Sequence, residues 1–182
     1  MFHILSISDK PYAVGVSSVS ALQRSTMKSP IGILTLIASP KGLSCLLFSQ
    51  SPIPQSLREK SIVDSRENQI ITTSKTQLEE YFAGQRDTFA VPLDLVGTPF
   101  QVQVWKSLTK VKFGATRSYS EQASSIGRPT AVRAVGSANG KNPVAIILPC
   151  HRIIASDGSI GGFSGGIKNK MWLLKHEQRT LH

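Results

Sequence analysis

Cys150 and His151 are the two adjacent side chains whose types could do nucleophilic chemistry, and they end an apolar run. A thiol attacks carbon only as the thiolate, so a nucleophilic cysteine needs a base or a positive neighbour. His151 could be that base. Adjacent residues on an extended strand point apart, however, so contact between the two requires a turn there or a bridging water. Cys45 lies among apolar residues and is expected to be a small buried thiol.

A third group should orient the histidine, and the basic second half of the chain holds only three acids for this role, Glu121, Asp157 and Glu177. Asp157 is expected in a turn and Glu121 in a helix cap, which leaves Glu177. The sequence therefore predicts a Cys-His-Glu constellation. On spacing alone, an inert buried cysteine beside a surface histidine is the commoner arrangement.

The elements that must position these residues fall into two halves of different charge. Residues 1–96 carry nine Lys/Arg against eight Asp/Glu, a net of +1, whereas residues 97–182 carry twelve against three, a net of +9. A basic half joined to a neutral one indicates that a polyanion docks on the former, although charge alone equally allows a solvated basic surface.

The longest apolar stretches, such as residues 144–148, have the length of core strands, so we expect no membrane span. Asp9 and Lys10 interrupt the start of the chain before any signal-peptide apolar region develops. We expect a cytoplasmic protein, or a nuclear one in a eukaryote. Arg24 and Lys28, in a Ser/Thr-rich stretch poor in acids, leave a transit peptide as a weaker alternative.

In the first half, the sequence predicts a variable leader over residues 1–28, a hairpin over 29–48 and polar loops over 49–70. A helix is predicted over 73–83, and residues 90–97, which include a proline, are expected to form an extended linker. We therefore predict an N-terminal α/β domain over residues 1–96 and a second domain over residues 97–182.

The second half predicts a helix-turn-helix. Thr98 with Gln101 and Ser118 with Glu121 have the spacing of capping boxes, and Thr130 is expected to cap a further helix after a turn at residues 127–129. The small side chains of that last helix would let it enter a nucleic-acid groove or, alternatively, pack tightly on the preceding helix. Beyond it, residues 142–154 predict a strand that delivers the cysteine, and a final helix is expected over 168–177.

The motifs of the second half closely resemble those of the alkylguanine-DNA alkyltransferases, or methylated-DNA protein-cysteine methyltransferases. The strongest motifs are PCHRII (149–154), NPV (142–144), GGFSGG (161–166) and WLLKHE (172–177). Others in the family's order are GTPFQ (97–101), Trp105, TRSY (116–119) and RAVG (133–136). The first half matches more loosely, through SPIG (29–32) and LEEYF (78–82).

The resemblance implies an α+β fold with a small ribonuclease H-like sheet domain, followed by a mostly helical, winged helix-turn-helix-like domain that carries the cysteine. It also implies direct-reversal DNA repair, in which Cys150 takes an alkyl group from O6 of guanine once per molecule. His151 would take the thiol proton through a water, Glu177 would stabilise the imidazolium, and Tyr119 would protonate the departing guanine and crowd the phosphate so that the nucleotide rotates outward.

The resemblance also implies roles for the remaining matched residues in the recognition of DNA and of the damaged base. Arg133 would fill the position vacated in the duplex. The DNA contacts implied are Ser118, Arg133, Ala134 and Arg152. The base-pocket residues implied are Asn142, Ile153, Phe163, Ser164 and Lys170. Many family members have tyrosine where Phe163 stands, so a hydrogen bond from that hydroxyl is not expected.

The resemblance implies no cofactor and no metal, and a monomer that acts on double-stranded DNA containing O6-alkylguanine. Activity on O4-alkylthymine stays open. The thioether product neither hydrolyses readily nor reduces as a disulfide does, so the protein should be consumed. The alternatives are a Cys-His-Glu thiol hydrolase or acyltransferase, a non-catalytic binder of alkylated DNA, and a DNA-binding regulator.

Overall fold

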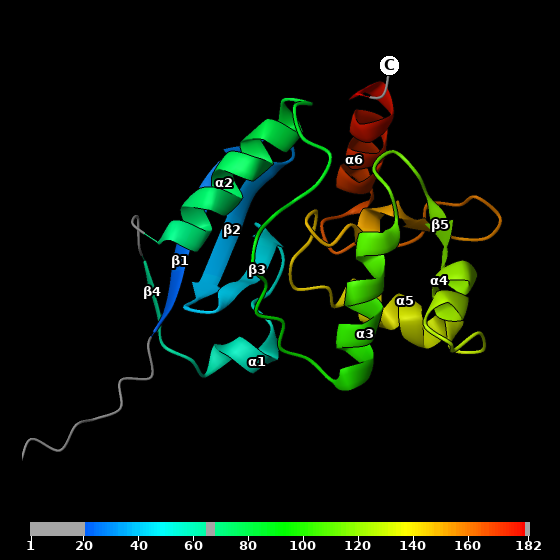
Figure 1. Ribbon diagram of the computed structural model, residues 1–182, viewed down its shortest axis with the longest axis horizontal. Helices are drawn as coiled ribbons and strands as arrows, with labels where there is room; N and C mark the ends of the chain where they lie inside the picture. Colours follow the sequence, from blue (N-terminus) through cyan, green and yellow to red (C-terminus); the bar gives the residue numbers. More distant parts are fainter. Residues whose placement is uncertain (1–20, 65–67, 181–182) are drawn as a thin grey trace, which may run out of the picture.

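A computed structural model describes residues 21–64 and 68–180 of the chain, and Figure 1 shows a sheet-and-helix half packed against a mostly helical half. The first half contains β1 (Leu22–Ser29), β2 (Gly32–Ser39), β3 (Gly42–Phe48), α1 (Gln55–Arg58), β4 (Ile62–Asp64) and α2 (Gln69–Phe82). The second half contains α3 (Pro99–Ser107), η1 (Leu108–Lys110), β5 (Arg117–Ser118), α4 (Tyr119–Ser125), α5 (Val132–Gly140), η2 (Cys150–Arg152), β6 (Ile153–Ile154) and α6 (Ile167–Thr180). This architecture confirms the expected fold class. Within the described ranges, no helix combines the length and the apolar character needed to cross a membrane.

The first half is built on a sheet with the order β3-β2-β1-β4, in which only β1 and β4 are parallel neighbours. The predicted hairpin is present as β2 and β3. The prediction of a leader was wrong for β1, which pairs with β2 along its length; its mostly polar sequence gives little strand signal. The rest of the predicted leader, residues 1–20, lies outside the described residues. The predicted loop over 49–70 also contains α1, β4 and the start of α2.

Helix α2 covers one face of the sheet, as Figure 1 shows, while α1 closes a smaller apolar cluster. The side chain of Asn68 caps α2 by accepting a hydrogen bond from the Ile71 backbone N–H at 2.9 Å. The helix therefore begins at Gln69, four residues before the predicted start. Cys45 belongs to the smaller cluster and is fully buried, which confirms it as a core residue. Burial raises the pKa of its thiol to about 12.

The segment predicted as a linker is extended and hydrogen-bonded to the sheet. The Leu43 N–H donates to the Pro92 carbonyl at 2.8 Å, and the Asp94 N–H donates to the Leu43 carbonyl at 3.0 Å. The Ser39 hydroxyl also donates to the Asp94 carboxylate at 2.6 Å. The chain thus stays attached to the first half until shortly before α3.

Both predicted capping boxes are present in the second half. Thr98 and Gln101 bond reciprocally at 2.9 and 3.2 Å at the start of α3, and Ser118 and Glu121 do so at 2.7 and 3.1 Å at the start of α4. Helices α3, α4 and α5 pack around a shared small core, which confirms the helix-turn-helix arrangement. The core residues are Val104, Ala123, Val135 and Ala138.

The prediction that Thr130 caps the next helix was wrong. Helix α5 begins at Val132, and its N-cap residue is Ala131, which makes no side-chain cap bond. A turn closed by the Ala131 N–H and the Arg128 carbonyl at 2.9 Å occupies the residues between. Thr130 lies within that turn, one residue before the N-cap position, so it does not cap the helix.

The prediction of a strand over residues 142–154 was wrong except at its end, where Ile153–Ile154 form β6. The chain folds back in tight turns that place Ile146 at a φ of 72°, and Cys150–Arg152 form the 3-10 turn η2. The apolar run is buried because it packs along β3, where the Leu46 N–H donates to the Pro143 carbonyl at 2.8 Å. A β-branched apolar run suits a buried series of turns as well as a strand, so composition could not separate the two.

Helix α6 completes the fold by packing against α2. The Trp172 and His176 rings stack at 4.9 Å, and Trp172 also lies 5.8 Å from the ring of Phe82. One ring nitrogen of His176 bonds the Tyr81 carbonyl at 2.7 Å. We call the cluster of rings at the contact of α2 with α6 the aromatic seam. It includes two rings from neighbouring loops, and its members are Tyr81, Phe82, Phe89, Phe113, Trp172 and His176.

Candidate active site

Cys150 is the first residue of η2 and is only 5% exposed. The side-chain amide of Asn142 donates to the Cys150 sulfur at 3.1 Å and to the Leu148 carbonyl at 2.7 Å. The oxygen of the same amide accepts from the Val144 N–H at 3.0 Å, which fixes the orientation of the amide. Asn142 therefore holds the turns before η2 together and presents an N–H to the sulfur, where negative charge would develop.

Burial raises the pKa of the Cys150 thiol, and this effect outweighs the hydrogen bond from Asn142 and the charge of Lys170, which lower it. A thiol in this position is protonated at neutral pH. It becomes a nucleophile only when a neighbouring base removes the proton.

His151 follows in η2 and is completely buried. Burial lowers the pKa of its imidazole more than Glu177 raises it, so the ring is neutral at neutral pH and can accept a proton. Nε2 lies 2.8 Å from Oε1 of Glu177. Because an ionised carboxylate can only accept hydrogen bonds, Nε2 must carry the hydrogen and Nδ1 the lone pair. Nδ1 is buried and makes no hydrogen bond with any described residue.

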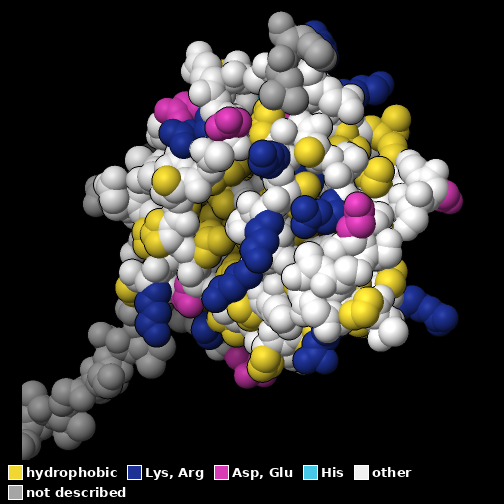
Figure 2. Space-filling model, turned by 45° about the vertical axis from the view of Figure 1, so that its right-hand side comes forward, with side chains coloured by type: hydrophobic (Ala, Val, Ile, Leu, Met, Phe, Trp, Pro, Cys, Tyr) yellow, Lys and Arg dark blue, Asp and Glu magenta, His cyan; other side chains and the backbone are white. Residues whose placement is uncertain are grey.

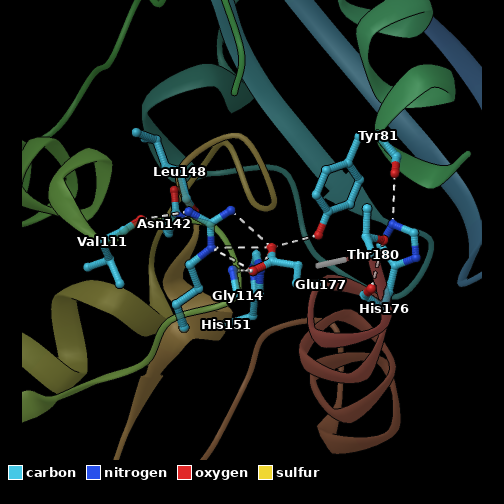
Figure 3. A network of polar contacts seen from close by, with 10 residues as sticks. Tyr81, Val111, Gly114, Asn142, Leu148, His151, His176, Glu177 and Thr180 are labelled. Carbon is cyan, nitrogen blue, oxygen red and sulfur yellow. Dashed lines mark hydrogen bonds and ion pairs between the residues drawn. The ribbon is translucent and has the colours of Figure 1, made fainter. Parts of the chain in front are cut away.

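Glu177 is the centre of the buried network in Figure 3. Besides His151, the carboxylate accepts hydrogen bonds from the Arg152 guanidinium at 2.9 to 3.2 Å, from the Gly114 N–H at 3.0 Å and from the Tyr81 hydroxyl at 2.8 Å. Burial by itself would raise the pKa of Glu177, but the hydrogen bonds of His151 and Arg152, with the positive charge that Arg152 carries and that His151 acquires on protonation, lower it to about 2. The carboxylate is therefore ionised throughout the physiological range.

The structure does not place Arg152 where the sequence analysis expected it. The guanidinium is buried, with two nitrogens on Glu177 and a third donating to the Val111 carbonyl at 2.7 Å. These bonds use three of its five N–H donors, and the residue is only 5% exposed, which argues against a phosphate contact at Arg152. The expectation of a DNA contact came from the family resemblance, and burial of the cation is not visible in the sequence.

Tyr119 opens α4 and is half-buried beside Cys150. A Cβ added to Gly161 would lie 3.3 Å from its hydroxyl, so the loop after β6 passes close to the ring. Burial, and then the charge of Cys150, raise the pKa of Tyr119, which keeps the phenol protonated and able to donate. The Lys170 ammonium lies 6.0 Å from the ring centroid and is itself buried.

The expected base-pocket residues surround this centre with different degrees of exposure. The Lys170 ammonium donates to the carbonyls of Ile153 and Ile160, which ties α6 to the loop after η2. The Phe163 ring lies 6.4 Å from the ring of His151 and 5.3 Å, edge to face, from that of Phe48. Ser164 is exposed on the same loop. The structure thus places the Phe163 ring beside His151 and fixes the loop that carries it through Lys170.

A cleft of about 880 Å³ opens beside this centre, between the segment that contains α1 and the start of α3. Phe48, Asn142 and Ser164 are among the residues that line it. In the described part of the chain, no group of three or more His, Cys, Asp or Glu side chains is placed to hold a metal ion.

The expected DNA contacts on α5 lie at the surface. Arg133, Ala134 and Ser137 are exposed, whereas Val135 is buried in the helix-turn-helix core. The exposed face is therefore smooth apart from one long cation. The Ser118 hydroxyl is occupied by the cap of α4, bonding Glu121 at 2.8 Å. Lys and Arg side chains run across the middle of the face shown in Figure 2, with acidic side chains scattered around them.

Sequence reasoning missed Tyr81 and Gly114, which both bond Glu177. Tyr81 was expected only within the predicted helix and the LEEYF motif, and its partner Glu177 lies 96 positions away in the sequence. Only the docking of α2 against α6 reveals the contact.

Comparisons with known proteins cover both halves of the chain. Residues 22–95 match the model of the 6-O-methylguanine DNA methyltransferase ribonuclease-like domain, and residues 99–179 match that of the DNA binding domain of the same family. Methylated-DNA--protein-cysteine methyltransferase of Mycobacterium leprae is 42% identical over 86% of this chain and 92% of its own length. The protein of that name from Methanosarcina barkeri is 44% identical over 85% and 96%.

A solved structure agrees with these relatives. The crystal structure of Mycobacterium tuberculosis OGT in complex with DNA superposes with a TM-score of 0.80 at 42% identity, covering 87% of this chain and 94% of that one. A second structure, of Mycobacterium tuberculosis O6-methylguanine methyltransferase, gives 0.76 at the same identity and covers 88% and 93%.

Proposed function

Because the chain belongs to the 6-O-methylguanine DNA methyltransferase family, we propose that it repairs O6-alkylguanine in double-stranded DNA by moving the alkyl group irreversibly onto Cys150. The activity of the family is direct-reversal DNA repair by alkyl transfer to cysteine, and DNA is the partner of the chain. The observation that carries the choice of acceptor is the buried Cys150 with an amide N–H on its sulfur, next to a neutral His151 paired with an ionised carboxylate.

Thiol activation follows from this arrangement. The Cys150 proton moves through a bridging water to Nδ1 of His151, the ring nitrogen that carries the lone pair. The resulting imidazolium is stabilised by Glu177 at Nε2, and the thiolate is stabilised by the Asn142 amide. Without these partners, burial would hold both groups in their neutral forms.

The thiolate then attacks the alkyl carbon, so that the S–C bond forms as the C–O6 bond breaks. The electron pair of the broken bond stays on guanine, which takes a proton from the Tyr119 hydroxyl. The raised pKa of Tyr119 supports this role, because the phenol is protonated before the reaction. Tyr119 is reprotonated afterwards, so in net the proton of the thiol ends on guanine.

The burial of the sulfur requires the target nucleotide to leave the duplex. A stacked base cannot bring O6 to a thiol that is 5% exposed. The exposed Arg133 on α5 would enter the duplex and fill the vacated position, with the small side chain of Ala134 allowing close approach. The Phe163 ring and the backbone around Ser164 would then receive the base.

All the proposed catalytic groups come from one chain, which supports action as a monomer. A substrate in genomic DNA supports a location in the cytoplasm of a prokaryote or the nucleus of a eukaryote. Transfer from O4-alkylthymine would require the same cavity to accept a pyrimidine.

The direct test uses a duplex with a single O6-methylguanine. After incubation and proteolysis, mass spectrometry should find one methyl group on the peptide containing Cys150, and transfer should stop after one equivalent. Cys150→Ala should still bind the alkylated duplex and transfer nothing. Cys45→Ala is the matched control, since it removes the other cysteine and should transfer normally.

The alternatives give different results in this assay. A binder of alkylated DNA would hold the duplex without any mass shift. A thiol hydrolase would show no shift either, but would turn over small esters repeatedly. Transfer by Cys150→Ala would move the acceptor to another residue.

A further inference from the structure

Tyr81 is a buried residue of α2 whose hydroxyl reaches across to the proposed catalytic network. It is 0% exposed, and its hydroxyl donates to Oε1 of Glu177 at 2.8 Å. The same oxygen lies 2.8 Å from Nε2 of His151. Figure 3 shows the Tyr81 phenol approaching the Glu177 carboxylate from α2 of the first half, while His151 belongs to the second half.

We propose that Tyr81 is a positioning residue for alkyl transfer, holding Oε1 of Glu177 in line with His151 so that thiol activation in the second half depends on a residue of the first. The inference rests on the function proposed above, because it acts through the activation of Cys150 by His151.

The competition for the carboxylate is the physical basis of this role. Arg152 bonds both oxygens, at 2.9 Å to Oε2 and at 3.0 and 3.2 Å to Oε1, and Gly114 also holds Oε2. These donors pull Glu177 toward the arginine side of the network. The Tyr81 hydroxyl is the bond that keeps Oε1 facing His151 from the opposite direction.

Packing alone does not account for a tyrosine at this position. The ring lies among Phe82, Phe89, Phe113 and His176 at centroid distances of 5.2 to 6.0 Å, which a phenylalanine ring would fill equally well. The hydroxyl adds only the bond to Glu177. Burial, followed by the negative charge of Glu177, raises the pKa of Tyr81 well above its ordinary value. The phenol therefore remains protonated, and able to donate, at every pH at which transfer would be measured.

The test is Tyr81→Phe, which keeps the ring and removes the hydroxyl. We expect single-turnover methyl transfer to Cys150 from an O6-methylguanine duplex to slow about tenfold at pH 7, the loss of one hydrogen bond to a charged group. Glu177 raises the pKa of His151, so a loosened carboxylate would leave the histidine of the variant less basic than that of the wild type. The acid limb of the pH–rate profile should therefore move to lower pH, and the defect should shrink as the pH falls.

Two controls separate positioning from stability. Phe89→Leu loosens the same seam at a ring 5.4 Å from Tyr81 without touching the carboxylate; it should lower the midpoint of urea unfolding and leave the shape of the pH–rate profile unchanged. In a Glu177→Gln background, adding Tyr81→Phe should change the rate by less than about twofold, because the two act as a unit.

A loss of rate that is equal at every pH would overturn the inference, as would a full tenfold additional loss in the Glu177→Gln background. Wild-type protein run alongside separates the two proposals. If the wild type methylates Cys150 and Tyr81→Phe has the same profile, only the role of Tyr81 fails. If the wild type methylates nothing, the proposed function fails and this inference with it.

Discussion

Replacing Arg152 with methionine would test whether the buried ion pair with Glu177 stabilises the protein. The guanidinium bonds both carboxylate oxygens and the Val111 carbonyl, and both members of the pair are buried. Arg152→Met keeps most of the apolar stem and removes the charge and the donors. The carboxylate left behind would be a buried charge with its main counter-charge gone.

The expected loss follows from that burial. Breaking a buried pair by removing one partner costs about 3–5 kcal/mol, whereas an exposed pair contributes about 0–1 kcal/mol. Glu177 would keep its bonds from Tyr81, His151 and Gly114, so we expect the lower end, about 3 kcal/mol of unfolding free energy. For a chain of this length, that corresponds to a fall of about 6–12 °C in the melting temperature.

Urea unfolding followed by the fluorescence of Trp105 and Trp172 measures this loss, provided that the slope with denaturant stays constant. Arg128→Met is the matched control, because Arg128 is exposed and its removal should change stability by less than about 0.5 kcal/mol. A loss below about 1 kcal/mol for Arg152→Met would show that the guanidinium is solvated, and the reasoning from burial would fail.

Three further expectations concern DNA, pH and the second cysteine. Arg133→Ala should slow repair in duplex DNA more than transfer from free O6-methylguanine, and should lower the salt dependence of DNA binding by about one unit in slope; equal losses on both substrates would refute its role in the duplex. Because the pKa of Glu177 is lowered from 4.5 to about 2, its stabilisation is complete above pH 4.5 and lost as the pH falls toward 2. Urea titrations should show this extra acid loss in the wild type and not in Glu177→Gln, and parallel curves would contradict it. Cys45→Ala should accept one methyl group per molecule, as measured by mass, and a loss of more than half would implicate this buried thiol.

Local hydrogen bonding explains which helix boundaries could be predicted. The capping boxes at Thr98 and Ser118 depend only on residues three positions apart, so their spacing in the sequence was sufficient. Thr130 has the right side chain but lies in a turn, and Asn68 was passed over as the true cap of α2. A residue capable of capping does so only if the chain leaves it at the helix start, which depends on the preceding turn.

The apolar run that ends at Cys150 shows the limit of reading burial from composition. Its β-branched residues indicated a buried segment correctly, but the turns around Ile146 arise from packing on β3 and from the Asn142 amide. Those partners lie outside the local window. The error mattered for chemistry, because neighbouring side chains such as Cys150 and His151 diverge by about 120° in a 3-10 turn, less than the 180° of a strand.

Residues of the candidate site could be predicted where they are neighbours in the sequence, or where their half of the chain holds few residues of the same type. Glu177 was found because only two other acids of the second half compete with it. Arg152 and Tyr81 could not be assigned in the same way, because one is a cation among many and the other an aromatic residue of a helix face. Their roles follow from the docking of α6 against α2.

The attachment of residues 92–94 to β3 has a consequence for how a damaged nucleotide can enter. The segment between the halves is bonded to the sheet on both sides of Leu93, and the aromatic seam joins the halves again at α6. A hinge opening between the halves would have to break the seam and the backbone bonds that Leu46 of β3 makes with Pro143 and Ala145. We therefore expect the protein to meet the duplex as a stiff body, so that the DNA supplies most of the deformation, at a cost of a few kcal/mol for each unstacked step.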